Sequence, residues 1–123
     1  MMRPPVLLSM AKAAAYLGDI QSAQHLLATL EGTLACDIAH IEAAIDAHDV
    51  ELLQTKWHQL KGFTPVFCTD VLVEEISQTE RLCKTTSTDS SQNNALQAST
   101  DLLTQLKQLQ SEVLAQLASP PPP

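Results

Sequence analysis

The chain has 123 residues, the usual size of a single domain with one buried core. Apolar residues make up 45% of the sequence and aromatic residues only 3%, so the core is expected to be aliphatic, which favours a helical bundle over a β-sandwich. Fourteen acidic against seven basic residues give a net charge of −7, which argues against nucleic acid and anionic membrane surfaces as partners.

The N-terminal part predicts a short helix followed by a long one. Pro4 and Pro5 can only precede a helix or lie in its first turn. A first helix is expected over residues 6–17, ended by Gly18, and Asp19 is well placed to cap a second helix over residues 20–47. The apolar residues of the second helix recur at spacings of three and four, as in a bundle, and are Ile20, Ala23, Leu27, Leu30, Leu34, Ile38, Ile41 and Ile45.

A third helix is predicted over residues 50–64, with His48 and Asp49 as the connection and Asp49 as its cap. Its buried stripe, at spacings of four, three and four, is Leu53, Trp57, Leu60 and Thr64. Pro65 cannot extend this helix without losing a backbone hydrogen bond. The helix is therefore expected to end or kink near that residue.

The remaining sequence predicts two more helices and a loop. The fourth helix follows Cys68, with Thr69 or Asp70 as cap, and its inner stripe is Leu72, Ile76, Thr79 and Cys83. The polar run over residues 85–94 predicts a loop. The last helix is expected over residues 95–117, and one of its sides carries Ser99, Leu102, Leu106, Leu109, Val113 and Leu117.

These elements predict an all-α protein, an antiparallel up-down four-helix bundle with a short extra N-terminal helix. Residues 1–18 form the lead and the short helix, residues 19–118 the bundle, and residues 119–123 a proline tail. No apolar run approaches the length of a membrane span, and no positively charged start followed by an apolar core marks a signal peptide. We therefore expect a cytoplasmic protein.

The stretch from Trp57 to Gly62 contains the residues that are the best candidates for a functional site. His58 lies one step of about 100° from the buried stripe, at the boundary between core and water. A glycine inside a helix lowers its stability by about 1 kcal/mol relative to alanine, so Gly62 calls for a reason. Its missing side chain would leave the His58 ring open to a partner. Lys61 supplies a positive charge for an anion. Glu80 would face the imidazole if the third and fourth helices form an antiparallel hairpin.

This stretch resembles the histidine-containing phosphotransfer (HPt) domain, whose signature is a helix carrying His-x-Leu-Lys-Gly. The motif is matched by His58, Leu60, Lys61 and Gly62. Leu72, Ile76 and Glu80 also fall where that family has a leucine, an apolar residue and an acid or amide. The resemblance covers residues 20–117.

The resemblance implies a role in a phosphorelay, not an enzyme with its own ATP site. His58 would accept a phosphoryl group on Nε2 from the aspartate of a receiver domain and pass it to another receiver. Lys61 and Gly62 would belong to the site, and Gln54, Gln59 and Glu80 would support it. The receivers, of a sensor kinase and a response regulator, would bring their own Mg²⁺, so the chain itself needs no cofactor or metal, and it would act as a monomer.

The residues after the glycine depart from the family pattern, which has small side chains there. The sequence has Phe63, Pro65 and Cys68 instead, which we interpret as a matter of partner specificity. If exposed, Phe63 and Phe67 would form an apolar patch for a receiver's helix.

Other interpretations remain open. A helical adaptor would dock a receiver or another partner without phosphotransfer. A metal or redox module would use the histidines and cysteines, although His25, His40, His48 and His58 are widely scattered and the cysteines have no paired spacing. An odd count of three, Cys36, Cys68 and Cys83, indicates reduced and mostly packed thiols. Taken alone, His58 would be an ordinary boundary histidine.

Overall fold

The computed structural model describes residues 7–86 and 88–118, and the predicted tail, the predicted lead over residues 1–5 and the first residue of the helix predicted over residues 6–17 lie outside these residues. The regular elements of the described chain are helices, which confirms the all-α class. Their bounds are α1 (Met10–Leu17), α2 (Ile20–Asp46), α3 (Val50–Leu60), α4 (Thr64–Phe67), α5 (Asp70–Lys84) and α6 (Asp89–Ala118).

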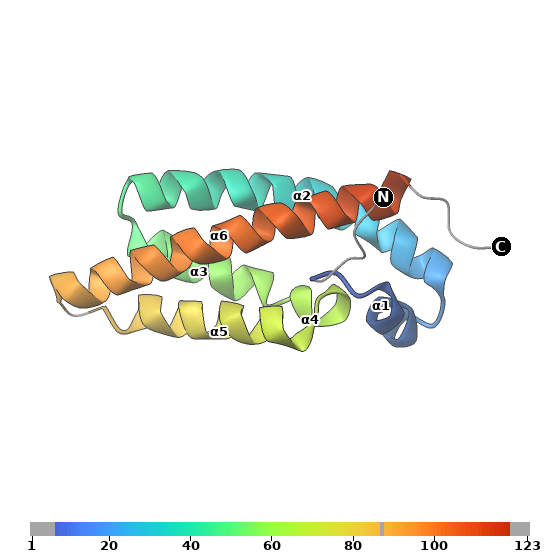
Figure 1. Ribbon diagram of the computed structural model, residues 1–123, viewed down its shortest axis with the longest axis horizontal. Coiled ribbons are helices and arrows are strands. Elements are labelled where there is room, and N and C mark those ends of the chain that lie inside the picture. Colours follow the sequence, from blue (N-terminus) through green and yellow to red (C-terminus); the bar gives the residue numbers. More distant parts are fainter. Residues whose placement is uncertain (1–6, 87, 119–123) are drawn as a thin grey trace.

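The two longest helices, α2 and α6, run side by side along the molecule (Figure 1). α3 packs against α2 and α5, and α5 packs against α3 and α6. α1 lies at one end, against α2 and α4. No helix of the described chain is long and apolar enough to cross a membrane.

Three predicted helix boundaries are confirmed by their capping groups. The side chain of Asp19 accepts a hydrogen bond from the Ser22 amide at 2.6 Å, and that of Asp49 accepts one from the Leu52 amide at 3.1 Å. Gly18 ends α1 in the left-handed conformation, with φ of 100°. The sequence signals for the starts of α2 and α3 and for the end of α1 were therefore correct.

The predicted stripes form the core. On α3 and α5 every predicted stripe position is buried, and on α6 only Leu117 is half-buried. On α2 the half-buried exceptions are Ile20, Leu30 and Ile45. Trp57 lies at the centre of this core, where its Nε1 donates to Ser99 Oγ at 3.0 Å and so joins α3 to α6.

The third helix is shorter than predicted. α3 ends at Leu60, a turn follows over residues 61–63, and α4 begins at Thr64. A continuous helix would need an amide at Pro65 to bond the Lys61 carbonyl, and the proline ring would clash with that carbonyl. The chain therefore breaks and restarts, with Pro65 in the first turn of α4.

Two further boundaries were predicted wrongly. α1 starts at Met10 because Ser9 caps it, and Leu8 is instead extended and pairs with Cys68. Residues 89–94, predicted as loop, belong to α6. There Thr88 Oγ1 accepts from the Ser91 amide at 3.1 Å and Ser91 Oγ accepts from the Thr88 amide at 3.0 Å, a reciprocal cap that starts a solvent-exposed polar turn.

Candidate functional site

A buried carboxylate lies at the centre of the candidate site. Glu80, on α5, has a side chain only 1% exposed. Its Oε1 accepts a hydrogen bond from Lys61 Nζ at 2.8 Å, and its Oε2 lies 2.9 Å from His58 Nδ1 and 3.3 Å from Lys84 Nζ. A buried charge needs such partners because its desolvation is costly.

The partners of Glu80 determine its ionisation. The hydrogen bond from Lys61 is the largest influence and, with those from His58 and Lys84, outweighs burial, so that the pKa of Glu80 falls to about 2. The acid is therefore a carboxylate near neutral pH, and a carboxylate can only accept hydrogen bonds. Nδ1 of His58 must then carry a proton and donate a hydrogen bond to Oε2.

That arrangement leaves the other ring nitrogen available. In a neutral imidazole with a proton on Nδ1, the lone pair resides on Nε2. The His58 side chain is 70% exposed, although its partner is buried. The ring is thus held by the protein on one edge and is accessible over most of its surface. This arrangement suits a side chain that acts as a nucleophile.

Helix geometry explains why these side chains meet. His58 and Lys61 are three residues apart, so they lie on one face of the end of α3. Glu80 and Lys84 are four apart on α5, which packs along α3. The hairpin of α3 and α5 thus brings both pairs together, and the expected proximity of Glu80 to His58 is present.

Sequence reasoning missed Lys84. The signal for it was present, because a glutamate followed four residues later by a lysine is a favourable pair on a helix surface. Its ammonium is half-exposed and shares Oε2 with the histidine. The candidate site therefore contains two lysines, Lys61 directly after α3 and Lys84 at the end of α5.

Gly62 occupies a different setting from the expected one. It lies in the turn after α3, where its amide donates to the Gln59 carbonyl at 3.0 Å. A Cβ at this position would lie 3.1 Å from that same oxygen, a tight contact. Gly62 therefore does not lie inside a helix, as was predicted, and its lack of a side chain suits the close backbone turn.

The two phenylalanines do not form an exposed patch. Phe67 is buried in the core and Phe63 is half-buried against it, because α4 packs against α1 and α5. The predicted apolar patch required both side chains to be exposed, and Phe67 does not meet that condition. Within the described chain, Gln54 and Gln59 make no side-chain hydrogen bond to the His58 ring.

The other histidines and the cysteines lie outside this cluster. His25, His40 and His48 are exposed, and no three His, Cys, Asp or Glu residues of the described chain are grouped to hold a metal ion. All three cysteines are free thiols. Burial raises the pKa of Cys68 to about 12 and also raises that of Cys83, so both are packed, unreactive thiols.

Comparison of the chain with protein-family models, with curated proteins and with solved structures finds no match.

Proposed function

We propose that the protein is a histidine phosphotransfer protein of a two-component phosphorelay. His58 would accept a phosphoryl group from a receiver-domain aspartate and pass it to the aspartate of another receiver. The observation that supports this most strongly is the exposed His58 ring whose Nδ1 is engaged by the buried, ionised Glu80. The resemblance at His58, Leu60, Lys61 and Gly62 points to the same function.

In the proposed reaction, Nε2 of His58 attacks the phosphorus of the aspartyl phosphate. A nitrogen–phosphorus bond forms while the bond from phosphorus to the aspartate oxygen breaks, and the receiver keeps the carboxylate. The ring becomes positively charged as it is phosphorylated. Glu80 stabilises that charge through the hydrogen bond to Nδ1, and the second transfer reverses the same steps.

The two lysines supply positive charge beside the ring. Lys61 and Lys84 both contact Glu80 and are partly exposed, so their ammonium groups lie at the edge of the site. Charge on the transferred group is spread over its equatorial oxygens in a loose transition state. In this proposal the lysines stabilise that charge, and the receiver provides the Mg²⁺.

The proposed architecture is an antiparallel up-down four-helix bundle made of α2, α3, α5 and α6. It is supported by the packing of each of these helices against two others and by short connections such as residues 47–49. We propose a cytoplasmic monomer that docks one receiver at a time. Free thiols throughout are compatible with that compartment.

The test is to incubate the purified protein with phosphorylated receiver domains and follow phosphate that is labile in acid and stable in base. The wild type should be labelled, His58→Gln should not, and His40→Gln, which changes an exposed histidine on α2, should be labelled like the wild type. Absence of label on well-folded wild-type protein with every receiver would overturn the proposal. If a receiver still binds in that case, the helical adaptor is the better interpretation.

A further inference from the structure

The segment before α1 is tied to the junction between α4 and α5. The Leu7 carbonyl accepts from the Thr69 amide at 2.9 Å, and the Ser9 amide donates to the Phe67 carbonyl at 2.6 Å. Lys12 Nζ donates to the Cys68 carbonyl between them at 2.9 Å. We call residues 7–9 together with the Lys12 side chain the N-terminal latch.

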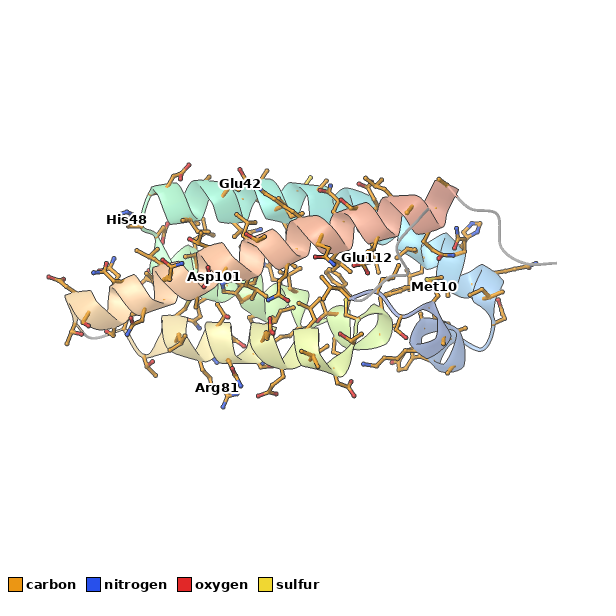
Figure 2. The ribbon with its side chains drawn as sticks, in the orientation of Figure 1. Met10, Glu42, His48, Arg81, Asp101 and Glu112 are labelled. Atoms are coloured by element: carbon orange, nitrogen blue, oxygen red, sulfur yellow. The ribbon has the colours of Figure 1, made fainter. Side chains whose placement is uncertain are left out.

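The other side of the latch is anchored on α6. The amides of Leu7 and Leu8 both donate to Glu112 Oε1 at 2.9 Å, and Gln108 Nε2 donates to Oε2 of the same carboxylate at 3.1 Å. Glu112 and Met10 lie toward the end of the molecule opposite His48 (Figure 2). The Leu8 side chain is buried against Phe67 and Cys68 in the core.

The junction held by the latch connects the two arms of the candidate site. On its N-terminal side, α4 is preceded by the three-residue turn that contains Lys61, and this turn follows α3 with His58. On its C-terminal side, α5 leads to Glu80. A helix of four residues such as α4 has little stability of its own, so its position depends on tertiary contacts.

We propose that Lys12 and Glu112 are positioning residues for the hydrogen bond between His58 and Glu80. By fixing residues 67–69, the latch fixes how far α3 and α5 can shift along each other. The ring is exposed and its partner is buried, so a small displacement would break their 2.9 Å contact. The effect of the latch on phosphotransfer follows only if the proposed function holds, but its effect on the ring does not require it.

The experiment compares Lys12→Met with Asp70→Asn. Lys12 also bonds the Asp70 carboxylate at 2.8 Å, but that carboxylate is 95% exposed, so Asp70→Asn removes the surface ion pair and keeps the bond to Cys68. Glu112→Ala is a second, independent way to release the latch. Lys12→Arg retains a cationic donor and should behave like the wild type.

Two NMR readouts are needed on each variant. Hydrogen exchange at the Ser9 and Thr69 amides reports opening of the latch, and the ¹⁵N shifts of the His58 ring report the share of the tautomer with a proton on Nδ1. Lys12→Met and Glu112→Ala should accelerate the exchange on the order of tenfold. Both should also lower the Nδ1–H share, whereas Asp70→Asn should change neither.

The outcomes separate this inference from the proposed function, because both readouts work without a receiver. Faster exchange with an unchanged His58 ring would overturn the inference and leave the latch with a purely structural role. Unchanged exchange in Lys12→Met and Glu112→Ala would overturn it as well. If the ring responds as expected but His58 is never phosphorylated, the inference holds and the proposed function fails.

Discussion

Nδ1 of His58 and Oε2 of Glu80 lie 2.9 Å apart, although the glutamate is almost fully buried and the histidine ring is mostly exposed. The buried carboxylate of Glu80 therefore interacts directly with a ring at the protein surface. Because Lys61 and Lys84 contact the same carboxylate, a change in any one of these groups should be detected at the others.

Glu80 should make the stability depend on pH. Its pKa is lowered from 4.5 to about 2 in the folded protein, so between these values the unfolded chain binds more protons. The stabilisation by Glu80 is complete above about pH 4.5 and is lost as the pH falls to 2. We expect Glu80→Gln to lower the free energy of unfolding by about 1–3 kcal/mol at pH 7.

Urea unfolding of the wild type and Glu80→Gln at pH 7, 4.5, 3 and 2 measures this effect. The difference in unfolding free energy between the two proteins should shrink steadily below pH 4.5. A difference that stays constant down to pH 2 would show that the folded-state pKa of Glu80 is not lowered.

The two lysines should affect Glu80 unequally. Lys61 is the largest cause of its lowered pKa and bonds it at 2.8 Å, whereas Lys84 lies 3.3 Å away. Lys61→Met should raise the pKa of Glu80, and Lys84→Met should raise it by less. NMR titration of the Glu80 carboxyl carbon measures both values. Arg81→Met is the control, because Arg81 pairs with Glu74 at the surface and should not affect the pKa of Glu80. A larger effect of Lys84→Met than of Lys61→Met would contradict the predicted order.

Leu60 should be essential for stability although it adjoins the candidate site. Its side chain is fully buried, so Leu60→Ala should lower the free energy of unfolding by about 2–5 kcal/mol. The neighbouring exposed Gln59 provides the control, and Gln59→Ala should cost less than about 0.5 kcal/mol. Urea denaturation measures both, and equal small losses would contradict the assignment of the buried face of α3.

His48 should be replaceable with a gain in stability. It follows the end of α2 with φ of 54°, a left-handed conformation that is unfavourable for residues with a Cβ. His48→Gly should therefore stabilise the protein by about 1 kcal/mol and raise its Tm by a few degrees. Ala47→Gly is the matched control, because Ala47 has φ of −86° and should lose stability instead. A lower Tm for His48→Gly would contradict the conformation.

The sequence predicted the helices best where one local rule decided the outcome. Asp19 and Asp49 marked helix starts because a short acidic side chain can bond the free amides there. The apolar spacing identified the buried faces of α3 and α5, and so placed His58 at a boundary and Glu80 within its reach. These signals depend on neighbours within one or two turns.

The features that were missed depend on contacts distant in sequence or on competing rules. Phe67 is buried because α4 packs against α1 and α5, which the proline alone does not specify. The pairing of Leu8 with Cys68 has no periodic pattern to reveal it. The first turns of α6 were predicted as loop because their residues are polar, whereas an exposed helical turn needs no apolar residues. The cap formed by Thr88 and Ser91 was not recognised within this polar run.

The bond from the Leu7 amide to Glu112 spans 105 residues of sequence, which orders events during synthesis. Leu7 is synthesised first, and its acceptor is made only after almost all of the described chain. At translation rates of about 5–20 residues per second, the interval between them is roughly 5–20 seconds. Any helix that folds during this interval therefore does so with this N-terminal segment still unanchored on α6.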